Sequence, residues 1–217
     1  MKIIIQNSYA VNYVPLGDLT WHKNKVDYAA RHGYETRLEV YPNNSHLPSY
    51  HGFKKIYHVQ RIFKEDAPDW VWVTGCDSMI TNFNIKLETI VDDNFHFIIA
   101  KDQNGINMDS FLIKNSPEGN DFLDFVASNY NAYKDHVWAE QQCVMDNEKK
   151  FSSITKIVPQ RTFNSYNYDF LPNEKPNLDG LGFDGNWQIG DFLIHWPATP
   201  LNRRIHFFER YSHHIIL

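Results

Sequence analysis

Short apolar runs alternate along the chain with longer stretches in which apolar residues recur every three or four positions. The short runs predict β-strands at 3–5, 36–41, 70–74, 94–100, 111–113, 154–158 and 191–196. The longer stretches predict helices over 20–32, 53–63 and 138–144, and a further helix that begins at Ser116-Pro117. This order of strands and helices is typical of an α/β fold whose sheet is mostly parallel.

Several local signals add detail to this outline. Thr20 is expected to cap the first long helix and Gly33 to end it. Four residues of that helix share one face, namely Trp21, Lys25, Tyr28 and Ala29. Residues 70–74 are apolar almost without interruption, which predicts a strand buried on both faces.

Ligands of such sheets bind at the carboxyl ends of the strands, so candidate chemistry is sought there. Neither a GxGxxG nor a GxxxxGK[ST] phosphate loop is present. A nicotinamide-type Rossmann domain and a P-loop protein are therefore excluded.

Composition narrows the class of protein. The 217 residues predict one domain over 1–217, and the hydrophobic (42%) and charged (22%) fractions exclude disorder. A net charge of −5 argues against nucleic acid and anionic membranes as partners. Two cysteines outside any CxxC pair indicate a reducing compartment, and no apolar run is long enough for a membrane span. We therefore expect a cytoplasmic protein, whose 15% aromatic content is compatible with stacking on sugars or bases.

Asp77 is the first candidate for chemistry, because it follows the buried strand 70–74 directly. One interpretation is a structural helix cap. The other is a ligand for a hard divalent cation that bridges to a phosphate, since no basic phosphate loop is present to supply positive charge.

Residues 70–82, WVWVTGCDSMITN, resemble the W-I-W-W-L-D-x-D-x-x-I-T-N segment of glycosyltransferase family 34. Five further segments are similar to motifs of that family, in the same order. They are NKVDYAARHGY at 24–34, Lys55-Ile56 followed by Arg61, NMDSFLIKN at 107–115, AEQQ at 139–142 and GDFLIH at 190–195. The resemblance extends over about residues 20–196, nearly the whole chain.

This resemblance implies the GT-A fold of nucleotide-diphospho-sugar transferases, a Rossmann-like three-layer sandwich with a mostly parallel central sheet. It implies transfer of a hexose or pentose, with retention, from a nucleoside-diphosphate sugar to a hydroxyl of a glycan or small-sugar acceptor. The implied cofactor is Mn²⁺ or Mg²⁺. Golgi members of the family carry an N-terminal anchor, and this chain begins at its first strand, so we expect a cytoplasmic version of the enzyme.

The resemblance also implies roles for individual residues. The implied metal ligands are Asp77 and His195, and the implied catalytic pair beside the anomeric carbon is Glu140 and Gln141. The implied donor-binding residues are Asn7, Lys55, Arg61, Cys76, Asp77, Asn107, Asp109 and Ser110. Lys55 and Arg61 are expected to neutralise the diphosphate and Asn7 to meet the base. A thiol-ligand role for Cys76 stays open.

Two positions depart from the family pattern. Gly75 stands where the first aspartate of the metal motif is expected, and Asp109 stands where the family has glycine. Loss of the first carboxylate predicts weaker metal binding than in two-aspartate relatives. Restoring it with Gly75→Asp is expected to strengthen metal binding.

Alternatives stay open at this point. A catalytically weak sugar-nucleotide-binding protein is compatible with Gly75, and a metal-dependent hydrolase with the 11 histidines, although the chain has no HxH or HExxH motif. Arg203 and Arg204 are further candidates for neutralising the diphosphate. Trp187, Trp196 and Tyr168 form either an acceptor platform or part of the core.

Overall fold

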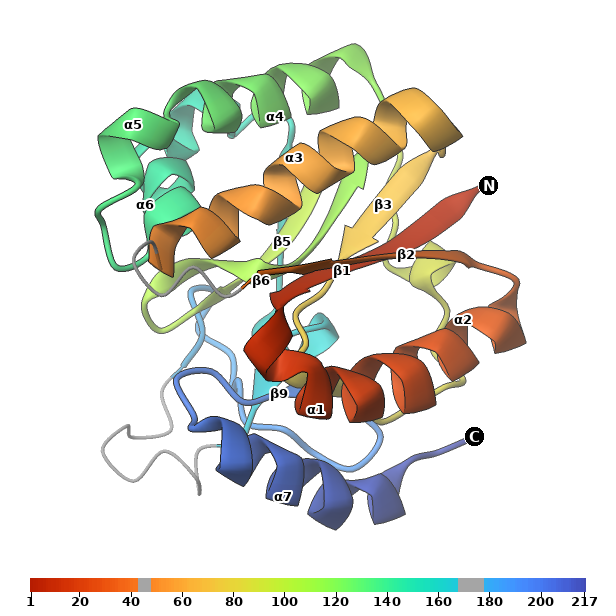
Figure 1. Cartoon of the computed structure of the whole chain (residues 1–217). Coiled ribbons are helices and arrows are strands. Elements are labelled where there is room, and N and C mark those ends of the chain that lie inside the picture. The colour runs from red at the N-terminus through yellow and green to blue at the C-terminus, as the bar shows by residue number, and fades with distance from the viewer. Residues whose placement is uncertain (43–47, 168–177) are drawn as a thin grey trace.

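A six-stranded sheet forms the centre of the molecule in the computed structural model, which describes residues 1–42, 48–167 and 178–217 (Figure 1). Its strands, in spatial order, are β2 (Glu35–Tyr41), β1 (Ile3–Ala10), β3 (Trp70–Val73), β6 (Gly105–Lys114), β5 (Phe97–Asp102) and β7 (Thr155–Val158). Strand β6 is antiparallel to both of its neighbours, and the other pairs are parallel. The predicted α/β fold with a mostly parallel sheet is confirmed.

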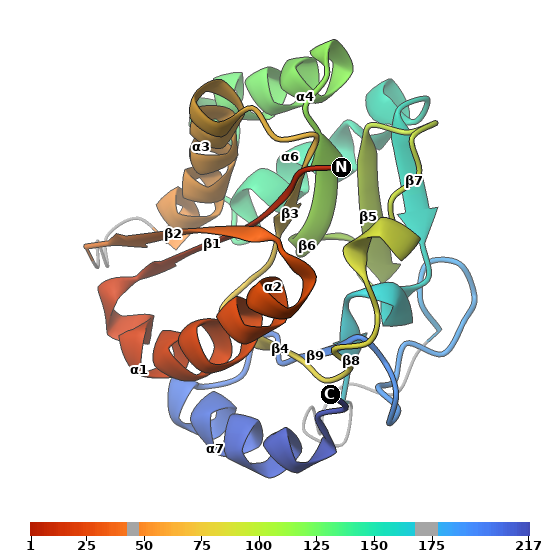
Figure 2. The ribbon, with the colours of Figure 1, turned by 90° about the vertical axis from the view of Figure 1, so that its right-hand side faces the viewer.

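Helices cover both faces of this sheet (Figures 1 and 2). One face carries α3 (Pro48–Asp66), α4 (Pro117–Ser128), α5 (Tyr130–Tyr133) and α6 (Ala139–Asp146). The other face carries a continuous helix made of α1 (Val14–Gly17), the π-helical turns of η2 (Asp18–Lys25) and α2 (Val26–His32). The three-layer sandwich predicted from the sequence is therefore present.

A second, three-stranded sheet lies below the carboxyl end of the central one (Figure 2). Its strands are, in order, β4 (Ser78–Ile80), β9 (Leu193–His195) and β8 (Ser165–Tyr166). Helix α7 (Leu201–Tyr211) packs on it through an apolar cluster that includes Met79 and Ile194. The predicted last strand thus exists, but it belongs to this second sheet.

Strand β3 is the centre of the core, as its apolar run predicts. Val71 and Val73 pack into the cluster beneath α3 and α4, whereas Trp70 and Trp72 pack into the cluster beneath α2. All four side chains are buried. The end of this strand is therefore held from both faces, which fixes the position of the loop that follows it.

Three predicted boundaries are wrong. The first long helix begins at Val14, so Thr20 is no cap, and its hydroxyl donates instead to the carbonyl of Cys76 at 2.7 Å. Strand β1 extends to Ala10, which places Asn7 inside the strand instead of after it. Strand β6 begins at Gly105, well before the predicted start at 111. The prediction missed its first half because polar residues interrupt the apolar run there.

None of the helices among the described residues is long and apolar enough to cross a membrane. Gly33 ends α2 as predicted, with a φ of +74° that favours glycine. The four residues expected to share a helix face, Trp21, Lys25, Tyr28 and Ala29, are all buried.

Lys25 is the unusual member of that buried face. Its ammonium donates to the carbonyl of Ser78 at 2.5 Å and to that of Thr20 at 3.4 Å. Burial lowers the pKa of Lys25 from 10.5 to about 8, against the opposing effect of nearby acidic groups. The cation thus ties η2 to the start of β4, at a cost in desolvation.

We expect a pH-dependent difference in stability between the protein and its Lys25→Met variant. Because the pKa of Lys25 is lower in the folded state, the unfolded chain binds more protons between pH 8 and 10.5. The free energy of unfolding of the parent should therefore rise relative to the variant over this interval, by roughly 3 kcal/mol. Urea denaturation of both proteins at several pH values measures it, and a constant difference would contradict the prediction.

Candidate functional site

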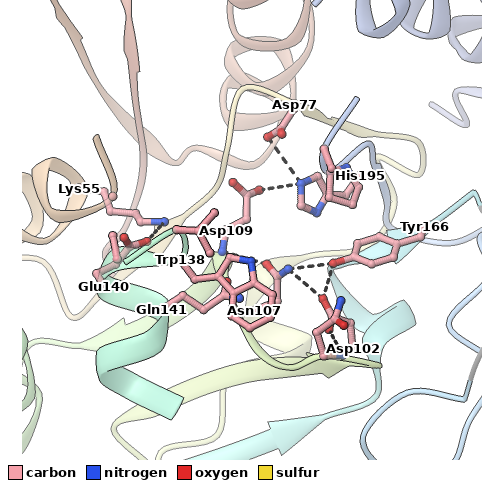
Figure 3. Close-up of a pocket in the computed structure, with 16 residues that line it drawn as sticks. Lys55, Asp77, Asp102, Asn107, Asp109, Trp138, Glu140, Gln141, Tyr166 and His195 are labelled. Atoms are coloured by element: carbon pink, nitrogen blue, oxygen red, sulfur yellow. Dashed lines mark hydrogen bonds and ion pairs between the residues drawn. The ribbon is translucent and has the colours of Figure 1, made fainter. Parts of the chain in front are cut away.

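A cavity of about 600 Å³ opens at the carboxyl edge of the central sheet (Figure 3). Strand β6 runs against its neighbours, so its first residues reach the edge at which β3 and β5 end. The lining side chains with polar groups are Lys55, Asp77, Asp102, Asn104, Asn107, Asp109, Trp138, Glu140, Gln141, Tyr166 and His195. The cavity has the size of a ligand site and gathers residues from α3, α6 and strands of both sheets.

Asp77, Asp109 and His195 form a compact group at one side of the cavity (Figure 3). Nε2 of His195 lies 3.5 Å from Oδ1 of Asp77 and 3.5 Å from Oδ2 of Asp109. The Oδ2 atom of Asp109 is buried and has no hydrogen-bond partner among the described residues. Two carboxylates and an imidazole that converge in this way fit a divalent cation.

The orientation of His195 suits a metal ligand. Its Nδ1 donates a hydrogen bond to Oδ1 of Asn164 at 2.7 Å, and Nδ2 of Asn164 faces the Tyr166 hydroxyl at 3.4 Å. This contact fixes the tautomer of a neutral ring and turns Nε2 toward the two carboxylates. Burial alone would lower the pKa of His195, but the carboxylates of Asp109 and Asp77 raise it above its ordinary value.

Asp77 is held from behind by Arg204 of α7. Oδ2 of Asp77 forms an ion pair with Nη2 of Arg204 at 2.9 Å, while Nε of Arg204 donates to the carbonyl of Trp196 at 3.1 Å. Burial alone would raise the pKa of Asp77, but Arg204 and His195 hold it well below its ordinary value. Asp77 is therefore ionised, and only Oδ1 is directed toward His195.

A second charged pair lies on the opposite side of the cavity. Nζ of Lys55 lies 2.8 Å from Oε1 of Glu140 and donates to the carbonyl of Met108 at 2.6 Å. Burial alone would lower the pKa of Lys55, but Glu140 raises it above its ordinary value. Oε1 of Gln141 accepts a hydrogen bond from the backbone N–H of Met108 at 3.0 Å. Gln141 thus bonds to Met108 of β6 directly, and Glu140 is linked to the same residue through Lys55.

A buried polar network supports the cavity from below. Oδ2 of Asp102 accepts hydrogen bonds from the Tyr166 hydroxyl at 2.5 Å and from Nδ2 of Asn107 at 3.0 Å. Oδ1 of Asn107 in turn accepts from the backbone N–H of Asp109 at 2.9 Å. Asp102, Asn164 and Tyr166 were not predicted from the sequence, because each lies outside the recognised motifs.

The structure brings most of the predicted site residues together. Seven of them line the cavity: Lys55, Asp77, Asn107, Asp109, Glu140, Gln141 and His195. Arg61, by contrast, is exposed on α3 and lies 3.5 Å from Glu39. Asn7 is buried inside β1, and Ser110 accepts a hydrogen bond from Nε1 of Trp72 at 3.0 Å. Donor-binding roles for these three residues stay predictions.

Cys76 packs away from this cavity, among Tyr9 and Leu16. Burial raises the pKa of its thiol well above the ordinary value. Cys76 is also not part of the group formed by Asp77, Asp109 and His195, called the metal-type group below. These surroundings favour a neutral, packed thiol over a ligand.

Of the aromatic residues considered for an acceptor platform, Trp187 and Trp196 do not line this cavity. Trp196 is buried against α7, and Nε1 of Trp187 donates to Oγ1 of Thr81 at 3.1 Å, so both serve packing. Tyr168 lies outside the described residues. Trp138, at the start of α6, lines the cavity instead and is 42% exposed.

Comparison with solved structures identifies the fold. A glycosyltransferase involved in the glycosylation of the major capsid of PBCV-1 superposes with a TM-score of 0.74, over 97% of this chain and 100% of that one, at 14% sequence identity. The galactosyltransferase LgtC, solved with donor and acceptor sugar analogs, gives a TM-score of 0.57 at 16% identity, over 98% of this chain and 95% of its own. The fold is the GT-A fold of glycosyltransferases.

The sequence identifies the family. The model of the galactosyl transferase GMA12/MNN10 family matches residues 16–94 and 90–200, and the chain belongs to this family. An uncharacterized alpha-1,2-galactosyltransferase of Schizosaccharomyces pombe is 30% identical over 189 residues, which cover 66% of this chain and 49% of the relative. The chain spans about half to two thirds of the length of the first curated relatives it matches.

Gly52 of α3 makes room for Glu140, and this generates a prediction. A Cβ added at Gly52 would lie 1.5 Å from Oε2 of Glu140. We expect Gly52→Ala to displace the carboxylate from Lys55 and to lower the free energy of unfolding by about 1–3 kcal/mol. In a Glu140→Ala background the same change should be neutral or stabilising, since alanine favours a helix over glycine. Chemical denaturation of the four proteins measures this coupling, and equal effects in both backgrounds would contradict it.

Proposed function

We propose that this chain transfers a sugar from a nucleoside-diphosphate donor to a hydroxyl of a sugar acceptor, with retention of configuration and the assistance of a divalent cation. The observation that carries the proposal is the group of Asp77, Asp109 and His195 inside the cavity of a chain that belongs to this family. The relatives named as galactosyltransferases and as a mannosyltransferase support a sugar-transfer reaction.

The cation is proposed to be held by Oδ1 of Asp77, Oδ2 of Asp109 and Nε2 of His195. Oδ2 of Asp109 supports this assignment, because it is buried and accepts no hydrogen bond from the described residues, which is costly for an anionic oxygen. When bound, the cation would neutralise the diphosphate leaving group. Mn²⁺ or Mg²⁺ suits a site in which carboxylates outnumber imidazoles.

The residues of α6 are proposed to lie beside the anomeric carbon of the donor sugar. Glu140 keeps a carboxylate at the cavity wall, balanced by Lys55, where it can stabilise positive charge that develops on the anomeric carbon. Oε1 of Gln141 is engaged with Met108, so Gln141 holds the start of β6 and presents the rest of its amide to the cavity. Lys55 is proposed to meet the phosphates, as its positive charge and position suit an anion.

Trp138 is proposed as the platform for the acceptor sugar. Its ring is the most exposed aromatic side chain among the residues that line the cavity. Flat aromatic rings stack on the apolar faces of sugars. The cytoplasmic location and the one-domain organisation expected from the sequence stay predictions.

A panel of nucleotide sugars with simple sugar acceptors tests the proposal. We expect transfer with Mn²⁺ and little transfer with EDTA. Asp77→Asn and His195→Gln should each lower kcat/KM about 100-fold or more, equivalent to about 3 kcal/mol of transition-state stabilisation. Asp121→Asn, on the exposed face of α4, is the control for loss of a carboxylate. Donor binding without transfer or donor hydrolysis would instead identify a sugar-nucleotide-binding protein.

The platform gives a separate prediction for Trp138→Ala. The acceptor KM should rise roughly three- to tenfold because stacking is lost, while the affinity for the nucleotide stays the same. Trp138→Phe should recover most of the loss. A KM for the acceptor that is unaffected in the alanine variant would remove Trp138 from the acceptor site.

A further inference from the structure

Positions 75 and 109 face each other across two neighbouring strands. Strands β3 and β6 pair antiparallel, and the last pair is Val73 with Phe111. Gly75 lies two residues after Val73, Asp109 lies two residues before Phe111, and the side chain of Asp109 lies beside Gly75. These are the two positions at which the chain departs from the pattern of the family it resembles.

The side chain of Asp109 fills the space that a side chain at position 75 would need. A Cβ built on Gly75 would lie 2.2 Å from Oδ1, 2.4 Å from Oδ2 and 2.6 Å from Cγ of Asp109. Real Cβ atoms do not approach other atoms so closely. The carboxylate itself is the clashing group, and it faces His195. A side chain at position 75 would therefore require the Asp109 carboxylate to leave its present position.

The position of Asp109 is fixed by hydrogen bonds from its own strand and from β5. Its backbone N–H donates to Oδ1 of Asn107, which the buried Asp102 anchors in turn. Its Oδ2 atom is buried and without a hydrogen-bond partner in the described part of the chain. The orphaned oxygen is one of the atoms that converge with Asp77 and His195.

We infer that Asp109 supplies, from strand β6, the second carboxylate of the cation site, and that it takes the place of a carboxylate at position 75. Gly75 is glycine because Asp109 occupies its side-chain volume. The inference rests on the proposed function in so far as it needs a divalent cation at this site. It reverses the expectation from the sequence that Gly75→Asp strengthens metal binding.

The experiment is an exchange of the two residues, with Mn²⁺ affinity measured by titration calorimetry and melting temperature measured without metal. Asp109→Gly should weaken Mn²⁺ binding by more than about tenfold, because loss of even an outer partner of a metal site costs that much. Gly75→Asp should melt at a lower temperature than the parent without metal and should bind Mn²⁺ no more tightly. The double variant Gly75→Asp/Asp109→Gly should recover at least about tenfold of the affinity that Asp109→Gly loses.

Two further variants keep the test decisive. Asp109→Ala repeats the loss without the backbone freedom that glycine adds to a strand. Glu140→Gln removes a different carboxylate of the same cavity and should leave Mn²⁺ affinity nearly unchanged. If the double variant fails to fold, equal Mn²⁺ affinity of Asp109→Ala and the parent overturns the inference, and a selective loss supports it.

The outcomes separate this inference from the proposed function. A parent that binds Mn²⁺ and transfers sugar, together with an Asp109→Ala variant that binds Mn²⁺ equally well, overturns only the role of Asp109. A double variant that folds but binds no better than Asp109→Gly overturns the exchange. A parent that binds neither Mn²⁺ nor Mg²⁺ overturns the cation site as a whole. If that parent still transfers sugar, the proposed sugar transfer stands and only the assistance of a cation is overturned.

Discussion

The structure around the cavity depends on a balance of charge. The cavity gathers four carboxylates, those of Asp77, Asp102, Asp109 and Glu140. Carboxylates this close repel one another in a medium of low dielectric, so the fold must supply compensating groups. Three buried or half-buried cations come from three different helices, namely Lys25 of η2, Lys55 of α3 and Arg204 of α7. Lys25 ties η2 to the start of β4, Lys55 ties α3 to β6, and Arg204 ties α7 to the loop that carries Asp77, so these charges also hold the layers together.

The reversed strand β6 makes this arrangement possible. In a purely parallel sheet, strand ends alone would reach the cavity, and the side chains would come from loops. Because β6 runs the other way, its first residues lie at that same edge while their backbone still belongs to the sheet. Helix α6 packs against this start, where Gln141 bonds to Met108 and Lys55 of α3 bonds to the same residue. Both catalytic candidates of α6 are thereby placed relative to the metal-type group.

The sequence predicts what local pattern controls and misses what distant contacts control. The apolar run 70–74 is enough to predict the buried strand β3, and motif resemblance is enough to bring Asp77 and His195 into one site. The early start of β6 could not be predicted from an apolar run, because Asn107 and Asp109 in its first half line the cavity. Tyr166 and Asn164 belong to no motif, and only the tertiary pairing of β8 with β9 places them beside His195. Positions 75 and 109 are brought together by the pairing of β3 with β6. The sequence alone does not specify which residues of two strands pair, so this neighbourhood could not be predicted.

The carboxylate at position 109 differs from one at position 75 in more than its origin. The negative charge of Asp77 is largely compensated by Arg204, 2.9 Å away, so Asp77 alone attracts a divalent cation weakly. Asp109 has no comparable basic partner among the described residues, since only His195 lies within ion-pair distance of it. The uncompensated charge of the group therefore lies on Asp109, and it lies on a strand whose backbone is fixed by the sheet instead of on the loop after β3. A cation at this site would be attracted chiefly by Asp109 and oriented by Asp77 and His195, and its affinity would then depend most on the residue that departs from the family pattern.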